Sequence, residues 1–174
     1  MTVLKRISTD AIPAALARAE RYRLLNQARQ AESICRDILA VDPAHHEATI
    51  LLLLSLSDCF TDEAADHAHV DALALVPKLD GDYARAYYDG LIIERWALAL
   101  QARSAPNHLI ADWIHQAMVL FEQAEALRPP DNDEALLRWN ACARLRDRLK
   151  RTERHTLEAG PEMTHLDQGD DPPR

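Results

Sequence analysis

The chain has 174 residues, of which 48% are hydrophobic, and its formal net charge is −8 at neutral pH. This length allows one domain with a substantial core, and a content of only four glycines and two phenylalanines argues against a sheet-rich fold. No apolar stretch is long enough to span a bilayer, and residues 1–7 lack the apolar core of a secretion signal. We therefore expect a cytoplasmic protein without a membrane partner.

Prolines and capping residues divide the chain into seven predicted helices. Ser8-Thr9-Asp10 followed by Pro13 indicates a helix start, because polar caps and a first-turn proline favour one, and this helix is expected to run to about residue 26. A second helix, 28–41, is expected to end at Asp42-Pro43, since the residue before a proline avoids the α region. Further helices are predicted at 44–59, at 62–76, from Asp80-Gly81-Asp82 to Arg103, at 109–127 and from Asn132 or Asp133 to about Arg154.

A sparse pattern of four positions recurs three times along these helices. Each copy has an alanine, then a larger residue, then a small or apolar residue, and then a proline, at fixed spacing. The second step between copies is longer than the first, because about five helical turns have been added upstream of the third copy. Such periodicity indicates a duplicated helical unit that stacks on its copies. The copies are Ala31, Cys35, Ile38, Pro43; Ala65, His69, Ala72, Pro77; and Ala117, Phe121, Ala124, Pro129.

This pattern resembles the tetratricopeptide repeat (TPR), whose second helix carries Ala-x3-aromatic-x2-Ala-x4-Pro. The best matching segment is 31–48, while the chain departs from the family at Leu53, where TPR has glycine or alanine, and at Cys35 and His69, where it has an aromatic residue. The resemblance implies an all-α fold, a right-handed α-α superhelix (solenoid) of about three TPR-like helix pairs plus a C-terminal capping helix.

The resemblance also implies a domain organisation. The TPR-like helical domain is expected to cover residues 1–154, with an irregular third unit at about 80–128. The segment 155–174 has five acidic residues and one basic residue, together with glycines and prolines, and is predicted to be a disordered tail.

In the TPR family the first helix of each pair lines a concave groove, so the resemblance implies a groove here with an aliphatic floor and charges of both signs. Family members that grip a C-terminal carboxylate use several Lys, Arg and Asn side chains, but only Arg23, Asn140 and Arg144 match such a set. A helix or extended peptide held by apolar anchors is the expected ligand. The implied groove residues are Leu16, Glu20, Arg23, Leu24, Glu47, Ile50, Leu54, Ser57, Asp58, Asn140 and Arg144, with Asp133 and Leu136 beside them and Tyr87, Leu91, Glu94 and Arg95 in the irregular unit.

The irregular unit contains a helix with apolar residues on more than one face, at 91–100. Two interpretations follow: the helix is deeply buried within the stack, or it contacts a second copy of the chain and forms a homo-oligomer. We expect Trp96, Trp113 and Trp139 in the core, although an exposed tryptophan would mark an interface.

One cluster offers potential metal ligands. His108, Asp112 and His115 are spaced at i, i+4 and i+7, which places them on one helix face that could hold Zn²⁺, although no fourth ligand is evident. This spacing supports an alternative hypothesis, a small helical metalloprotein or hydrolase. The chain has no GxSxG, HExxH or glycine-rich phosphate loop, so we expect neither enzymatic activity nor a cofactor. Three widely spaced cysteines without a CxxC pair favour free thiols in a reducing compartment.

Basic residues concentrate in the last predicted helix, where residues 138–154 have a net charge of +5. A basic stripe of this kind could contact nucleic acid or an anionic membrane, but the acidic total argues against strong polyanion binding. The leading hypothesis is a non-enzymatic scaffold or adaptor that binds another protein or a peptide in its groove or through the irregular third unit. A further alternative is a chaperone for a secreted substrate, since this chain resembles acidic three-repeat proteins of similar length with that role.

Overall fold

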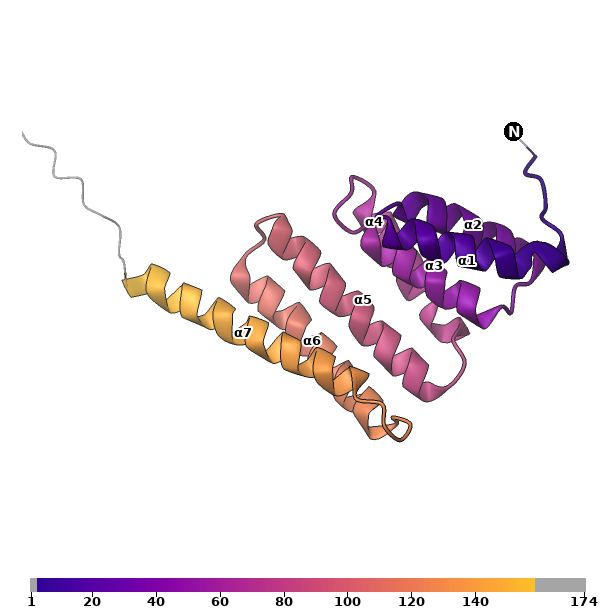
Figure 1. Ribbon diagram of the computed structural model, residues 1–174. Coiled ribbons are helices and arrows are strands. Elements are labelled where there is room, and N and C mark those ends of the chain that lie inside the picture. The colour runs from indigo at the N-terminus through magenta and orange to yellow at the C-terminus, as the bar shows by residue number, and fades with distance from the viewer. Residues whose placement is uncertain (1–2, 159–174) are drawn as a thin grey trace, which may run out of the picture.

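The computed structural model describes residues 3–158, and this part of the chain forms seven α-helices and no β-strand (Figure 1). The expected all-α fold is therefore confirmed. No helix within these residues is both long enough and apolar enough to cross a membrane. The helices are α1 (Ile12–Leu24), α2 (Ala28–Val41), α3 (His46–Asp58), α4 (Ala65–Leu73), α5 (Asp82–Ala102), α6 (Asn107–Ala126) and α7 (Glu134–Glu158), with single 3-10 turns at Thr9–Ala11 and Val76–Lys78.

Helix ends follow the predicted breakers closely, with two differences. The bounds of α2 are those predicted, whereas α4 is shorter than expected at both ends. At the predicted start, Asp62 lies outside the helix and pairs with Arg29, and the capping position is Ala64, which has no side-chain acceptor. At its end Pro77 lies within a separate 3-10 turn. Helix α7 continues past the predicted end to Glu158, and residues 159–174, which make up most of the predicted tail, lie outside the described residues.

The nine helical positions of the repeated pattern are all buried, at 0% to 9% exposure. They lie on α2, α4 and α6, and the small residues among them let a neighbouring helix approach closely. Phe121 on α6 lies close against Gly90 on α5: a Cβ atom on Gly90 would lie 2.9 Å from Cε1 of Phe121. The pattern that the sequence repeats is therefore a pattern of helix contacts.

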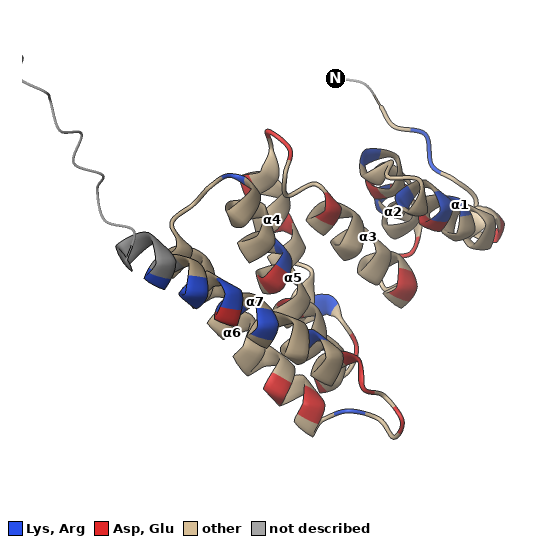
Figure 2. Cartoon of the chain, turned by 60° about the vertical axis from the view of Figure 1, so that its left-hand side comes forward, with Lys and Arg blue, Asp and Glu red and all other residues tan. Residues whose placement is uncertain are grey.

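Successive helices pack against one another as neighbours, and α5 with α6 is the most extensive of these contacts. The odd-numbered helices also touch, α1 with α3, α3 with α5 and α5 with α7, and so form one layer. In Figure 1 this layer faces the viewer, with α2 and α6 behind it. The turned view in Figure 2 shows basic residues recurring along α7.

The core has two main apolar clusters, and α5 contributes to both. Ile92 and Trp96 pack in the cluster shared with α1–α4, whereas Ile93 and Ala97 pack in the cluster shared with α6 and α7. Helix α5 is apolar on more than one face because each of these faces is buried within a single chain. The first of the two interpretations of this helix is the one that the packing supports.

The third helix pair is longer than the other two. Helix α5 has 21 residues, compared with 13 in α3, and α6 has 20, compared with 9 in α4. The added residues lengthen both helices around the turn that joins them, where Ser104 adopts a positive φ of 58°. The irregularity expected at 80–128 is therefore an extension of one helix pair and does not introduce a separate element.

Candidate functional site

Three odd-numbered helices each contribute charged side chains to one ion-pair cluster. Nε of Arg23, on α1, lies 2.7 Å from Oδ2 of Asp58, at the end of α3. Nη1 of Arg95, on α5, lies 2.6 Å from Oδ1 of the same carboxylate and also donates a hydrogen bond of 2.6 Å to the hydroxyl of Ser57. Asp58 thus joins three helices, and we refer to Arg23, Ser57, Asp58 and Arg95 as the Asp58 site.

The Asp58 site carries two guanidinium groups and one carboxylate, which leaves one excess positive charge. The side chains of Arg23, Asp58 and Arg95 are 22%, 29% and 21% exposed, so all three reach the surface. Burial lowers the pKa of Arg95, and the Asp58 charge opposes this effect. An arginine retains its charge under these conditions. The site can therefore offer charge-assisted hydrogen bonds to a carboxylate or carbonyl group of a ligand.

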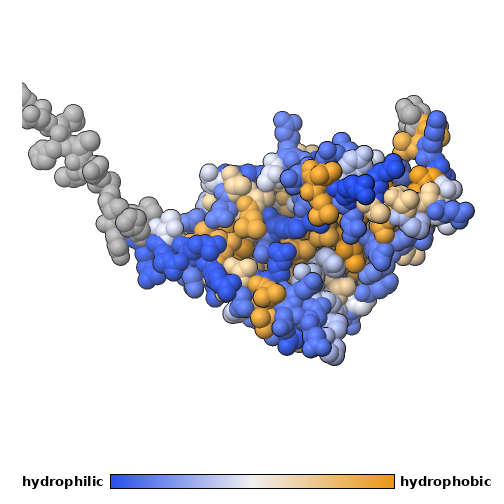
Figure 3. All heavy atoms as spheres, viewed as in Figure 1, coloured by the Kyte–Doolittle hydropathy of each residue, from blue (hydrophilic) through white to orange (hydrophobic). Residues whose placement is uncertain are grey.

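Two open clefts meet at Asp58. One, of about 370 Å³, is lined by Arg23, Leu24 and Asp58 together with residues of the α1–α2 turn. The other, of about 230 Å³, is lined by Asp58, Arg95 and Leu98 together with the end of α3. Leu24 is 78% exposed and Leu98 is 42% exposed, so an exposed leucine stands on each side of the charged cluster. Figure 3 shows hydrophobic side chains gathered in the middle of the odd-helix face, beside the hydrophilic surface of α7.

The structure brings four of the eleven predicted groove residues to the clefts or to the ion-pair cluster: Arg23, Leu24, Ser57 and Asp58. The other predicted residues line neither cleft. Leu16, Ile50 and Leu54 are half-buried against the core, Glu20 and Glu47 are exposed elsewhere on α1 and α3, and Asn140 and Arg144 lie on α7.

Of the residues expected from the irregular unit, only Arg95 reaches the site. Tyr87, Leu91 and Glu94 are buried, so the expectation that they line an exposed groove is wrong. Glu94 serves another purpose: its Oε2 lies 3.3 Å from Nη1 of Arg138, which ties α5 to α7. Burial raises the pKa of Glu94, and the charge of Arg138 opposes this effect.

The proposed metal ligands do not form a metal site. His108, Asp112 and His115 are exposed on the first half of α6, and His108 lies in its first turn because the helix begins at Asn107. Among the side chains that the structure describes, no three His, Cys, Asp or Glu come close enough together to hold a metal ion.

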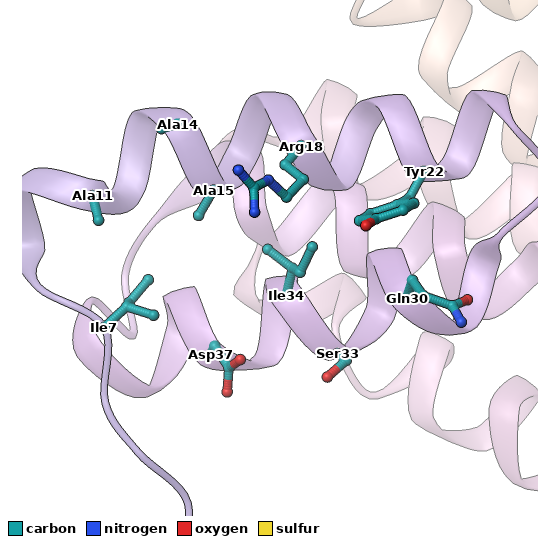
Figure 4. A pocket seen from close by; sticks show the side chains of 10 residues that line it. All are labelled: Ile7, Ala11, Ala14, Ala15, Arg18, Tyr22, Gln30, Ser33, Ile34 and Asp37. Atoms are coloured by element: carbon teal, nitrogen blue, oxygen red, sulfur yellow. The ribbon is translucent and has the colours of Figure 1, made fainter.

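A cleft of about 500 Å³ lies between α1 and α2 and was not predicted (Figure 4). The corresponding face of the second pair, one repeat further along the chain, is covered where α2 packs on α3, and Leu52 and Leu56 are buried there. No described helix covers the same face of α1, where Arg18 replaces the leucine and is exposed. A charged side chain suits contact with water, so we attribute this cleft to the uncovered edge of the first pair. Its lining residues are Ile7, Ala11, Ala14, Ala15, Arg18, Tyr22, Gln30, Ser33, Ile34 and Asp37.

The three cysteines are free and buried. Burial raises the pKa of Cys35 and of Cys142 to about 12 and that of Cys59 to about 11. All three thiols are therefore protonated at neutral pH, and a protonated thiol is a poor nucleophile and metal ligand.

Comparisons with protein-family models, with curated proteins and with solved structures find no match to this chain.

Proposed function

We propose that this protein is a non-enzymatic scaffold or adaptor that binds another polypeptide at the Asp58 site. The observation that carries the proposal is the position of the site, where charges from α1, α3 and α5 converge between two clefts. A ligand that crosses this face would contact three helices at once. Because the helices pack on one another, the protein loses little conformational entropy when the ligand binds.

The chemistry of the site fits a polypeptide. Leu24 and Leu98 supply apolar surface on the two sides of the cluster, and Arg23 and Arg95 supply donors between them. Peptide groups offer carbonyl acceptors for such donors at regular intervals, and apolar side chains of the ligand would cover the leucines. The leucines alone or the arginines alone would not select a peptide. Together they match a peptide, in which polar backbone groups and apolar side chains alternate.

We further propose that the helices form a right-handed superhelix of the TPR-like class. Three observations support this arrangement. Helices α1 (12–24) and α3 (46–58) are offset by the same repeat length at their starts and at their ends, the nine repeated positions are buried, and the odd-numbered helices form a layer. In a TPR-like stack this layer is the one that lines the ligand groove, which is consistent with the Asp58 site.

Absence of catalysis and a cytoplasmic location complete the proposal. The protonated state of the three thiols removes the strongest nucleophiles of the chain at neutral pH. Three free thiols also favour a reducing compartment.

The experiment is affinity capture from the native cell with the wild type and a Leu24→Glu/Leu98→Glu variant, followed by quantitative mass spectrometry. Both leucines are exposed, so the substitutions should leave the fold intact, which circular dichroism would check. We expect the variant to lose at least one partner that the wild type captures, because glutamates would repel apolar ligand groups from both clefts.

The matched control is Leu109→Glu/Val119→Glu, which places the same charges at similarly exposed positions on α6, where Leu109 is 39% and Val119 is 40% exposed. The control should capture the same partners as the wild type. If the Leu24/Leu98 variant also retains every partner, the Asp58 site is not the binding site.

A further inference from the structure

The arginines of this chain fall into two groups with respect to ion pairs. Every arginine from Arg23 to Arg138 pairs with a carboxylate. None of the next six basic side chains has an ion pair with a side chain that the structure describes. These six are Arg144, Arg146, Arg148, Lys150, Arg151 and Arg154.

Three of the unpaired residues share one face of α7. Arg144, Arg148 and Arg151 are exposed and spaced at i, i+4 and i+7, which aligns them along the helix, away from the buried Cys142 and Leu145. They span about 10 Å along the axis at the helical rise per residue. We refer to Arg144, Arg148 and Arg151 as the α7 basic face, and Figure 2 shows the basic residues along this helix.

The helix dipole does not account for this face. Cations are favoured near a helix C-terminus, but the effect falls off within the last turn. Helix α7 ends at Glu158, so Arg151 and Arg144 lie beyond the reach of that effect. Exposed Asp147 lies one turn from both Arg144 and Arg151, so this face carries three arginines and one carboxylate, a net charge of +2. The excess positive charge is available to carboxylates of a partner.

We propose that the α7 basic face binds an acidic segment of a partner polypeptide. An extended chain advances about 3.3 Å per residue, so acidic residues three positions apart are about 10 Å apart. This distance matches the separation of Arg144 and Arg151 along α7, with Arg148 between them. The partner segment therefore carries two Asp or Glu residues three positions apart, and their carboxylates pair with the guanidinium groups of Arg144 and Arg151.

The charge of the remaining chain selects a short acidic segment over nucleic acid. Helix α7 has seven Lys or Arg and four Asp or Glu, a net of +3, whereas residues 3–133 have 12 Lys or Arg and 20 Asp or Glu, a net of −8. A nucleic acid longer than the basic face would extend over this acidic surface and be repelled. A peptide with a few carboxylates contacts the basic face alone. The inference does not depend on the function proposed for the Asp58 site.

The probe is a fluorescein-labelled 12-residue peptide with Glu at every third position and Gly or Ser elsewhere, and its binding to the full chain is followed by anisotropy. We expect the Arg144→Glu/Arg148→Glu/Arg151→Glu variant to bind at least about tenfold more weakly, since favourable charge pairs are replaced by repulsion. Binding by the wild type should weaken as the salt concentration rises. A milder Arg144→Gln/Arg148→Gln/Arg151→Gln variant should lose part of the affinity. This variant tests the proposal even if the glutamate variant does not fold.

The matched control is Lys5→Glu/Arg21→Glu/Lys78→Glu, which makes the same change in net charge at exposed positions outside α7 and should bind within about twofold of the wild type. Equal loss in the control, or equal binding of a peptide with Gln in place of Glu, would overturn the proposal. So would tighter binding of a 20-base-pair DNA duplex, or loss of the peptide in the Leu24→Glu/Leu98→Glu variant. Tenfold tighter binding after Asp167→Asn/Asp170→Asn/Asp171→Asn would show that carboxylates of the chain itself occupy the face, which also excludes the proposal.

Discussion

The imidazole ring of His69 lies flat against the indole ring of Trp96, with their centroids 4.2 Å apart and their planes at 3°. The rings of Phe60 and Trp113 lie nearly perpendicular to the same imidazole, with centroids 5.5 Å and 6.0 Å away. Within the described residues Nε2 of His69 is buried and has no hydrogen-bond partner. A polar ring thus occupies a position of the repeat that is surrounded by aromatic groups. It stacks on Trp96 but leaves one buried nitrogen without a hydrogen bond, which is unfavourable.

Replacing His69 by phenylalanine is expected to raise the free energy of unfolding by about 1 kcal/mol, because the buried unpaired nitrogen is removed. The effect should depend on pH. Burial lowers the pKa of His69 in the folded chain, and Asp66 opposes this effect. Below the ordinary histidine pKa of about 6.5 the unfolded chain therefore takes up a proton before the folded chain does, and the wild type loses stability. Urea unfolding at pH 7.5 and pH 5.5 should show a larger advantage of H69F at the lower pH. A pH-independent difference would contradict the assignment.

Asp58→Asn is expected to lower the free energy of unfolding by about 1 to 2 kcal/mol, because Arg23 and Arg95 would then face one another without the intervening carboxylate. The value lies below that of a fully buried pair because the site is partly exposed. Asp62→Asn is the matched control, since Asp62 pairs with Arg29 where both side chains are 46% exposed. This control should change stability by less than about 0.5 kcal/mol. Equal effects in urea titrations would mean that Asp58 has no special role in joining the helices.

Gly90→Ala is expected to destabilise the protein by about 1 to 3 kcal/mol although alanine favours helices. The new methyl group would lie 2.9 Å from Cε1 of Phe121 and 3.2 Å from Cβ of Leu120, so α5 and α6 would have to move apart. A second substitution, Phe121→Leu, should recover part of the loss in the double variant by making room. Thermal unfolding of the four proteins would give the coupling energy, and strict additivity would argue against this contact.

Arg138→Met is expected to cost about 2 kcal/mol at pH 7, because it leaves the carboxylate of Glu94 buried without its partner. The pKa of Glu94 is raised by burial, and without Arg138 it should rise further. Since a carboxyl group with a raised folded-state pKa prefers its proton, the defect should shrink as the pH falls from 7 to 5. Chemical unfolding across that range measures it. Arg128→Met, which breaks the exposed pair with Asp133, should show a small defect that does not change in this way.

The sequence predicted the helices well because their boundaries depend on local chemistry. Pro43 ends α2 where expected, since a proline restricts the residue before it whatever the tertiary structure. The repeated alanines, such as Ala31 and Ala117, were identified by spacing alone and are buried at helix contacts. The start of α4 was predicted too early, at 62, where Asp62 instead pairs with Arg29, a residue distant in the sequence.

The candidate site was predicted less completely because it depends on tertiary contacts. Arg23 and Asp58 were identified from the repeat, but their pairing requires α1 and α3 to lie side by side. On α5 the sequence could not separate exposed from buried positions, because apolar residues occur on more than one face. Leu98 was missed for this reason, and Leu91 was wrongly expected on the surface although it is 2% exposed.

The participation of α5 in both apolar clusters limits how this chain can be divided. Many repeat proteins are modular: units can be removed from one end, and the remainder still folds because each unit contacts only its neighbours. Here truncation before α5 would strip the α1–α4 cluster of Ile92 and Trp96, and truncation after it would expose Ile93 and Ala97. The two halves should therefore unfold in a single cooperative transition, and the shortest autonomous folding unit should be the whole seven-helix body.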